Sequence, residues 1–92
     1  METQIKKQIK DYIRSIGGYV ATVPGGAYGT NGTPDLIACV NGRFIGIEGK
    51  YGDGTQSGWQ ITRQAQIEAA GGIYLIAYSA DYVRTMIETL IL

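Results

Sequence analysis

The sequence predicts a single α/β domain, residues 1–92, in which a mixed four-stranded sheet is flanked by helices. A chain of 92 residues accommodates one domain. Apolar residues recur with helical and strand periods in the order α-β-β-β-α-β-α. The helix between the third and fourth strands is a crossover connection, so these two strands can run parallel in one sheet.

The first half of the chain begins with an amphipathic helix over residues 2–16. Its apolar face is formed by Ile5, Ile9, Tyr12, Ile13 and Ile16. A pair of glycines ends the helix, and the run YVATV at 19–23 is typical of a short strand. The glycine-rich run PGGAYGTNGT at 24–33 is expected to be a long loop, and long loops often carry function.

The second half of the chain alternates strands and helices. Strands are expected at 35–40, 43–50 and 73–78, and helices at 59–70 and 80–91. A second glycine-rich loop, at 51–58, precedes the helix that begins with Trp59. Trp59 and Ile61 are expected to pack into the core. The last strand, IYLIAY, is apolar throughout, as expected for a strand that is buried on both faces.

The Asn-Gly pair at 41–42 fixes the register of the central hairpin. Asn-Gly between two apolar runs favours a two-residue type I′ turn. In the register that this turn sets, Asp35 faces Glu48 across the two strands. Facing side chains project on the same side of a sheet. Lys50, two residues after Glu48, projects on that side too.

Two carboxylates that face each other repel, so a cation between them is expected. Lys50 could supply the positive charge. A divalent metal ion such as Mg²⁺ is the better candidate, because it binds carboxylate oxygens and keeps waters for substrate phosphates. The alternative is that Asp35 and Glu48 are both solvated at the frayed end of a sheet. The shared register and the adjacent lysine favour a site.

Other polar residues of the two helices are further candidates. Glu2 precedes Ile5 by three residues and therefore falls on the apolar face of the first helix, where an acid needs a partner. The alternative is an ordinary glutamate in the first turn of a helix. Gln60 and Gln64 share a face of the second helix. For Gln64 and Gln66 a solvated polar face is the favoured interpretation.

These positions match a known nuclease signature. The pair Pro34-Asp35, followed by Glu48-x-Lys50 on the next strand, resembles the P-D…(D/E)-x-K signature of the restriction-endonuclease-like nucleases. Longer pieces resemble the virus-type replication-repair nuclease domain over nearly the whole chain: E-x-x-I at 2–5, G-x-P-D-L-I at 32–37, G-R-F-x-x-I-E-x-K at 42–50 and A-A-G-G at 69–72. The size of the chain agrees with that of the stand-alone, phage-type members. The resemblance implies a restriction-endonuclease-like core.

The resemblance also implies a role for each matching position. Asp35, Glu48 and the backbone carbonyl of Gly49 would bind Mg²⁺ or Mn²⁺. Glu2 would bind the metal as well, directly or through a water. Lys50 would orient the attacking water or help to deprotonate it, and would stabilise the charge that develops on the phosphate.

One helix residue and one strand residue complete the comparison with the family. Gln60 corresponds to the family's helix glutamine by its distance from the glycine pair at 71–72, and Gln64 is the alternative if the helix begins later. Gly49 departs from the pattern, since the family usually has an apolar β-former there. Glycine weakens a strand, but here it could leave room for a neighbouring side chain or a bulge.

The formal net charge is zero, with 8 basic and 8 acidic residues, which by itself argues against a nucleic-acid-binding protein. If a metal neutralises Glu2, Asp35 and Glu48, the basic residues outnumber the remaining acids and could hold DNA phosphates. The candidates for contact with DNA are Lys6, Lys7, Lys10, Arg14, Arg43, Arg63 and Arg84, with Tyr28 or Tyr51 stacking on a base. The alternative for the cations is a solvated helix face.

Composition and resemblance together set the expected context. One cysteine and no histidine exclude an intramolecular disulfide and a Cys/His zinc site, and favour a reducing, intracellular setting. The resemblance implies the cytoplasm of a bacterial or phage-infected cell. No apolar run has the length of a membrane span. The resemblance implies a homodimeric endonuclease that cuts branched DNA such as four-way junctions. The alternative is a non-catalytic DNA-binding or assembly module with the same fold.

Overall fold

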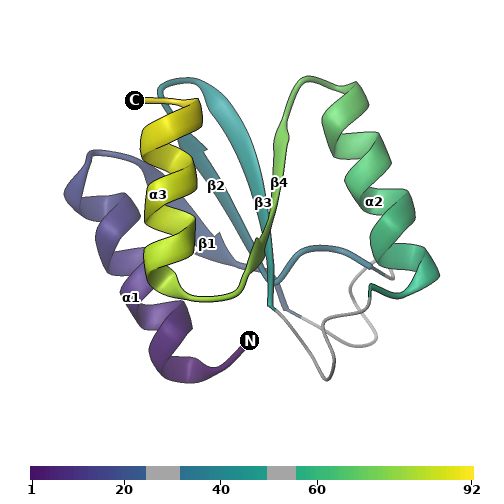
Figure 1. Cartoon of the computed structure of the whole chain (residues 1–92), viewed down its shortest axis with the longest axis horizontal. Coiled ribbons are helices and arrows are strands. Elements are labelled where there is room, and N and C mark those ends of the chain that lie inside the picture. The colour runs from purple at the N-terminus through teal and green to yellow at the C-terminus, as the bar shows by residue number, and fades with distance from the viewer. Residues whose placement is uncertain (25–31, 50–55) are drawn as a thin grey trace.

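The computed structural model describes residues 1–24, 32–49 and 56–92. Its elements follow the predicted order (Figure 1): α1 (Thr3–Ser15), β1 (Tyr19–Thr22), β2 (Leu36–Val40), β3 (Arg43–Gly49), α2 (Gly58–Ala69), β4 (Ile73–Ala77) and α3 (Ala80–Leu90). Each expected helix and strand is present, and the ends differ from expectation by a few residues at most. The helices begin where Glu2, Ser57 and Ser79 accept hydrogen bonds from backbone amides of the first turn.

The four strands form one mixed sheet in the order β1-β2-β3-β4. Both β1 with β2 and β2 with β3 pair antiparallel, whereas β3 and β4 pair parallel. The parallel pair is joined through α2, as a crossover requires. The α/β class and the mixed four-stranded sheet predicted from the sequence are therefore confirmed.

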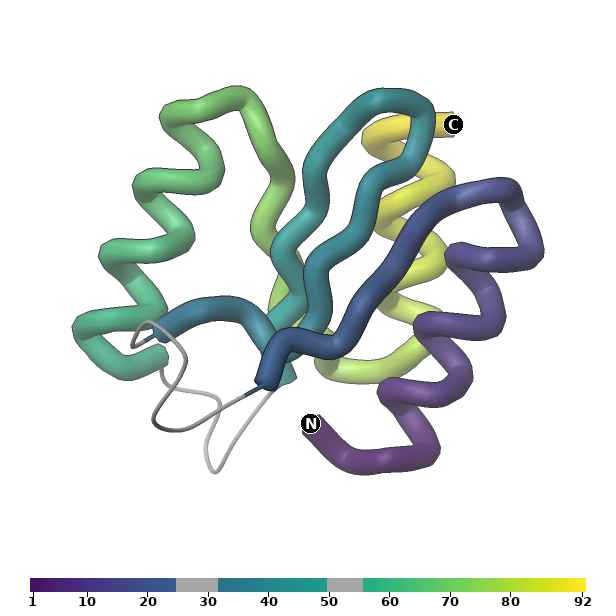
Figure 2. Tube along the Cα trace, turned by 180° about the vertical axis from the view of Figure 1, so that it is seen from behind, coloured from purple at the N-terminus to yellow at the C-terminus, as the bar shows by residue number. Residues whose placement is uncertain are grey.

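The helices cover the two faces of the sheet unequally. Seen from behind, α1 and α3 lie together on one face, and α2 lies alone on the other (Figure 2). The core fills the space between the sheet and the α1–α3 pair, with its largest fully buried side chains at Ile9, Ile13, Leu36, Val40, Ile45, Ile47, Val83 and Ile87. Burial of each such side chain contributes about 1.5–3 kcal/mol.

The α2 face of the sheet is packed more sparsely, and one prediction fails here. No residue of α2 is fully buried, and Trp59 and Ile61 are each 55% exposed. The expectation that they pack into the core is wrong. The side of α2 that faces the sheet carries Gln60, Gln64 and Ile67, spaced four and three residues apart, so that Trp59 and Ile61 turn away.

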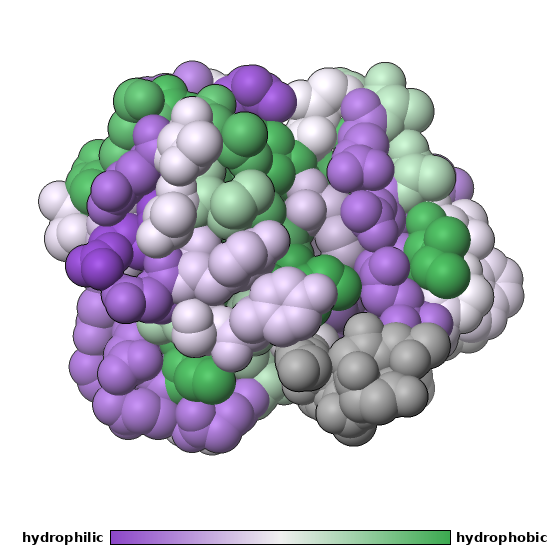
Figure 3. Space-filling view, viewed as in Figure 1, coloured by the Kyte–Doolittle hydropathy of each residue, from purple (hydrophilic) through white to green (hydrophobic). Residues whose placement is uncertain are grey.

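The surface reflects this division. Apolar residues reach the surface near the C-terminal end of α3 and again on α2, while the lower part of α1 is mostly hydrophilic (Figure 3). The C-terminal apolar residues are Leu90 and Leu92, which are 48% and 57% exposed. In the part of the chain that the structure describes, no helix is both long enough and apolar enough to cross a membrane.

Candidate active site

The hairpin between β2 and β3 has the predicted register. Val40 pairs with Arg43, and Leu36 pairs with Ile47. The turn residues at 41–42 both have positive φ, 51° and 77°, as a type I′ turn requires. Asp35 comes directly before Leu36, and Glu48 comes directly after Ile47. The two carboxylates therefore face each other where the ladder ends.

Asp35 is fixed at the end of the sheet by contacts of its backbone and of its side chain. Its backbone carbonyl accepts a hydrogen bond from the Val23 amide at 2.8 Å, and its Oδ2 accepts one from the Gly49 amide at 3.0 Å. The amino nitrogen of Met1 lies 3.3 Å from the same Oδ2. The side chain of Asp35 remains 26% exposed, so this carboxylate can be reached from solvent.

Glu48 lies deeper, with only 3% of its surface exposed. The pKa of its carboxyl is raised to about 8, mainly by burial and then by the negative charge of Asp35 and a hydrogen bond with that carboxyl. Hydrogen bonds from the Gly49 amide and the Gln60 side chain act in the opposite direction. A buried carboxyl beside a second carboxyl is a site that binds either a proton or a cation.

Gln60 reaches this pair from the first turn of α2. Its Oε1 accepts a hydrogen bond from the Ser57 amide at 2.8 Å, while Ser57 Oγ accepts one from the Gln60 amide at 3.2 Å. This capping box fixes the glutamine side chain. The Oε1 atom is engaged, which leaves the Nε2 amide as the donor toward Glu48. Gln64 bonds Gln56 at 3.0 Å instead, so of the two alternatives it is Gln60 that lies at the carboxylates.

The segment before Asp35 packs closely on the same helix turn. Gly32 has a φ of +79°, and a Cβ there would lie 2.4 Å from the Trp59 carbonyl and 2.7 Å from the Gln60 amide nitrogen. Only glycine permits both this conformation and this approach. The contact ties the start of α2, and with it Gln60, to the strand that carries Asp35.

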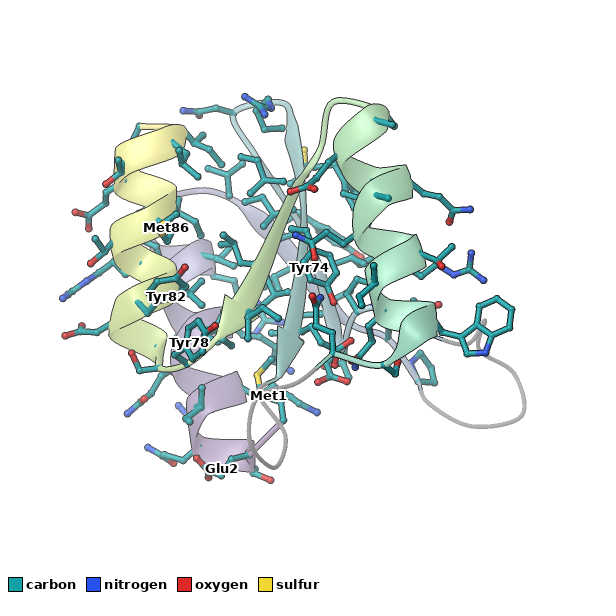
Figure 4. All side chains as sticks on the ribbon, turned by 45° about the vertical axis from the view of Figure 1, so that its right-hand side comes forward. Met1, Glu2, Tyr74, Tyr78, Tyr82 and Met86 are labelled. Atoms are coloured by element: carbon teal, nitrogen blue, oxygen red, sulfur yellow. The ribbon has the colours of Figure 1, made fainter. Side chains whose placement is uncertain are left out.

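Gly49 has a comparable steric reason, which the sequence left open. A Cβ there would lie 2.9 Å from Asp35 Oδ2 and 2.9 Å from the Cα of Met1. Glycine therefore leaves room for the Asp35 carboxylate and for the backbone of Met1. Figure 4 shows Met1 lying toward the end of the sheet beside this position, whereas Glu2 lies farther down, at the beginning of α1.

Glu2 lies at the start of α1, in agreement with the second of its two interpretations. It is the exposed N-cap of α1, and its carboxylate oxygens accept hydrogen bonds from the amides of Gln4 at 2.6 Å and Ile5 at 3.1 Å. The interpretation that puts Glu2 on the apolar face is wrong, because the helix begins only at Thr3, and the interpretation as an ordinary glutamate at the start of a helix is the one that fits. Among the described residues no three acidic side chains gather as a metal-binding group. A part for Glu2 in metal binding stays a prediction.

The described part of the site nevertheless fits a divalent metal. Asp35 and Glu48 offer carboxylate oxygens, the donors that Mg²⁺ and Mn²⁺ prefer. Lys50, Tyr28 and Tyr51, three further predicted site residues, lie outside the described residues.

Tyr74 is a residue near the carboxylates that the sequence did not reveal. It pairs with Gly46 on β3, so it projects on the same face as Glu48, and it is only 7% exposed (Figure 4). Burial raises the pKa of its hydroxyl, a contact with Gln56 lowers it, and the charges of Glu48 and Asp35 raise it again. The uniformly apolar run around it concealed the residue, although its register with β3 would have indicated it.

The predicted DNA-contacting cations do not form one patch. Lys6, Lys7, Lys10 and Arg14 follow α1, where Lys7 pairs with Asp11 at 2.6 Å. Lys10 Nζ donates to Thr22 Oγ1 at 3.2 Å, close to the end of β1 beside Asp35. Arg63 lies on α2, on the opposite face of the sheet. Their contact with DNA stays a prediction.

The fold is shared with nuclease structures. A solved structure described as a VRR_NUC domain matches with a TM-score of 0.78 and 23% sequence identity, over 97% of this chain and 96% of that chain. The Holliday junction resolvase Hjc of the archaeal hyperthermophile Archaeoglobus fulgidus matches with a TM-score of 0.58 and 15% identity, over 85% of this chain and 71% of that chain. The restriction-endonuclease-like fold expected from the motifs is therefore confirmed.

Comparisons of sequence alone give no further match. No family model matches the chain, and no curated protein does.

Proposed function

We propose that this protein is a metal-dependent endonuclease of the virus-type replication-repair nuclease family that hydrolyses phosphodiester bonds in branched DNA. The observation that carries the proposal is the facing of Asp35 and buried Glu48 at the end of the hairpin, with Gln60 hydrogen-bonded to Glu48. The fold shared with a VRR_NUC domain and a Holliday junction resolvase supports it. Four-way junctions are the substrate class that we favour.

Each site residue has a distinct task in this proposal. Asp35, Glu48 and the Gly49 carbonyl hold Mg²⁺ or Mn²⁺, which when bound lowers the pKa of a water and polarises the phosphate. The Gly49 amide fixes the Asp35 carboxylate, and the Gln60 amide fixes Glu48. Lys50, which follows Gly49 in the sequence, supplies positive charge where negative charge develops on the phosphate.

Cleavage assays test the proposal directly. Four-way junctions, flaps, splayed arms, plain duplex and supercoiled plasmid are incubated with the protein and Mg²⁺ or Mn²⁺. We expect cutting of branched DNA that stops in EDTA, and a loss of at least about 100-fold in Asp35→Asn, Glu48→Gln or Lys50→Ala. Asp81→Asn and Glu88→Gln, which change exposed acids of α3, are the matched controls and should cut normally. No cutting of any substrate by folded protein with metal would refute the proposal.

The competing function is a DNA-binding or assembly module without catalysis. Titration of Mn²⁺ by calorimetry separates the two at the site itself. The nuclease proposal requires metal binding that disappears in Asp35→Ala, whereas a non-catalytic module that has lost the metal site shows the same heat in both proteins. DNA binding without metal binding would favour the module.

We also propose that the protein acts as a homodimer in the cytoplasm, where a two-fold pair of sites could nick both strands of a junction. Among the exposed apolar surfaces of the described residues, we favour two as candidates for such a contact. One is the row formed by Tyr19, Cys39 and Phe44, which face one another across β1, β2 and β3, and the other is formed by Leu90 and Leu92. Sedimentation of Phe44→Glu and Leu90→Glu, each compared with the unmodified protein, would identify the dimer surface.

A further inference from the structure

Trp59 is an unusual residue to find on the outside of α2. It is the only tryptophan in the chain and leaves 55% of its surface in solvent, although a tryptophan normally buries most of its large apolar area. The guanidinium carbon of Arg63 lies 5.5 Å from the centroid of the indole ring. Arg63 is itself fixed by a hydrogen bond from its Nη1 to Gln66 Oε1 at 2.8 Å. The ring is thus held on one helix turn, with a cation beside it.

The position of Trp59 connects it to the candidate active site. It directly precedes Gln60, so the Cα atoms of the two residues are about 3.8 Å apart. The Gln60 side chain is hydrogen-bonded to Glu48, and the Trp59 carbonyl packs against Gly32, three residues before Asp35. The indole itself points away from the sheet, so the aromatic surface lies on the outer side of the helix turn that carries Gln60.

The electrostatics of this end of α2 suit an anionic ligand. The first turn of α2 contains no acidic residue, and the helix dipole makes its N-terminal end positive. Arg63 adds a full positive charge at the ring. A ligand with a flat π-surface and a phosphate could stack on the indole and place its phosphate near Arg63. A purely apolar ligand would instead remove water from Arg63 without replacing its hydrogen bonds.

We propose that Trp59 and Arg63 form a stacking platform, on the outer side of α2, for an unpaired nucleobase of DNA that is bound at the active site. This inference rests on the proposed nuclease function. Bases inside a duplex already stack on their neighbours, so only an unpaired base can offer its face to an exposed indole. The platform would therefore favour DNA with an unpaired segment that extends from the active site over α2.

The single tryptophan makes the platform directly observable. Intrinsic fluorescence is titrated in EDTA with a single-stranded oligothymidylate, and in parallel with a blunt duplex of equal length. We expect the single strand to quench Trp59 and the duplex to leave it nearly unchanged. Equal quenching by both, or none by the single strand, would overturn the proposal. Quenching that follows protein concentration without DNA would assign the ring to a contact between two copies instead, and would overturn it too.

Variants then separate stacking from a general loss of affinity. Single-strand binding, measured by anisotropy of a labelled oligonucleotide, should weaken about 5- to 150-fold in Trp59→Ala, the range found for loss of one base–aromatic stack. Trp59→Phe should recover most of the affinity. The matched control is Ile61→Ala, which removes an equally exposed apolar side chain two residues away and should bind normally. Circular dichroism of each variant checks that it is folded.

The failure of the platform and the failure of the nuclease proposal give different results. If Trp59→Ala binds single strands as well as the unmodified protein and metal-dependent cleavage is intact, the platform is refuted and the nuclease stands. If single strands quench Trp59 in the expected way but no substrate is cut with metal, the nuclease proposal falls and the base-binding surface stands.

Discussion

The raised pKa of Glu48 predicts a measurable loss of stability as pH rises in the metal-free protein. The pKa of this carboxyl moves from an ordinary 4.5 to about 8 in the folded state. Below pH 4.5 both folded and unfolded chains carry the proton. Between pH 4.5 and 8 only the folded chain keeps it, so the free energy of unfolding falls by about 1.4 kcal/mol per pH unit. Above pH 8 the loss is complete, at up to about 5 kcal/mol.

Urea denaturation in EDTA from pH 5 to pH 9 measures this slope. Glu48→Gln keeps a neutral side chain at every pH, so its stability should be nearly flat where the unmodified protein declines. Glu88→Gln, an exposed change on α3, should decline like the unmodified protein. Identical slopes for the unmodified protein and Glu48→Gln would refute the reasoning, because the proton would then not reside on this carboxyl.

Metal binding provides a second test of the Glu48 carboxyl. Because a ligating carboxylate must be ionised, Mn²⁺ affinity should rise about tenfold per pH unit up to pH 8 and level off above it. The metal should also restore stability most at high pH. An affinity that does not change with pH would mean that Glu48 is not a ligand.

Three further substitutions have expected outcomes that follow from local geometry. Gly49→Ala places a Cβ 2.9 Å from both Asp35 Oδ2 and the Met1 backbone, so we expect a loss of about 1–3 kcal/mol in urea denaturation and weaker Mn²⁺ binding in calorimetry. Gly32→Ala meets the Trp59 carbonyl at 2.4 Å and should both destabilise the fold and shift Trp59 fluorescence, whereas Gly42→Ala, with a similar φ of +77° but open space, should cost only about 1 kcal/mol and leave the fluorescence unchanged. Tyr74→Phe removes a buried hydroxyl that has no well-formed hydrogen bond among the described residues, and should leave stability unchanged or raise it by about 1 kcal/mol; a loss greater than 1 kcal/mol would mean that the hydroxyl bonds Gln56.

The hairpin was predictable because its information is local. The Asn-Gly turn at 41–42 accepts only a narrow range of backbone angles, and the two-residue period then carries the register five residues along each strand to Asp35 and Glu48. Gln60 could be chosen over Gln64 only in the structure, since the choice depends on how Ser57 caps the helix.

The failed predictions concern α1 and α2, where the helical period alone did not determine which residues face the core. Glu2 matches the apolar spacing of α1, but a helix begins where its first amides find an acceptor, and the Glu2 carboxylate is that acceptor. Trp59 and Ile61 are apolar, yet the apolar residue of α2 that packs against the sheet is Ile67, which lies over Gly46. A Cβ at that position would lie 3.1 Å from Ile67. Such tertiary contacts cannot be inferred from the spacing of apolar residues along the helix.

The sparse packing of α2 is better explained by the site than by stability. A helix that covers one face of a sheet alone would be expected to bury its largest apolar residues, but α2 turns Gln60 inward and leaves Trp59 outside. An apolar residue in place of Gln60 would bury more area, yet it would leave Glu48 without its amide donor and beside Asp35 with less compensation. The polarity of this helix face therefore helps two carboxylates to remain at the end of the hairpin.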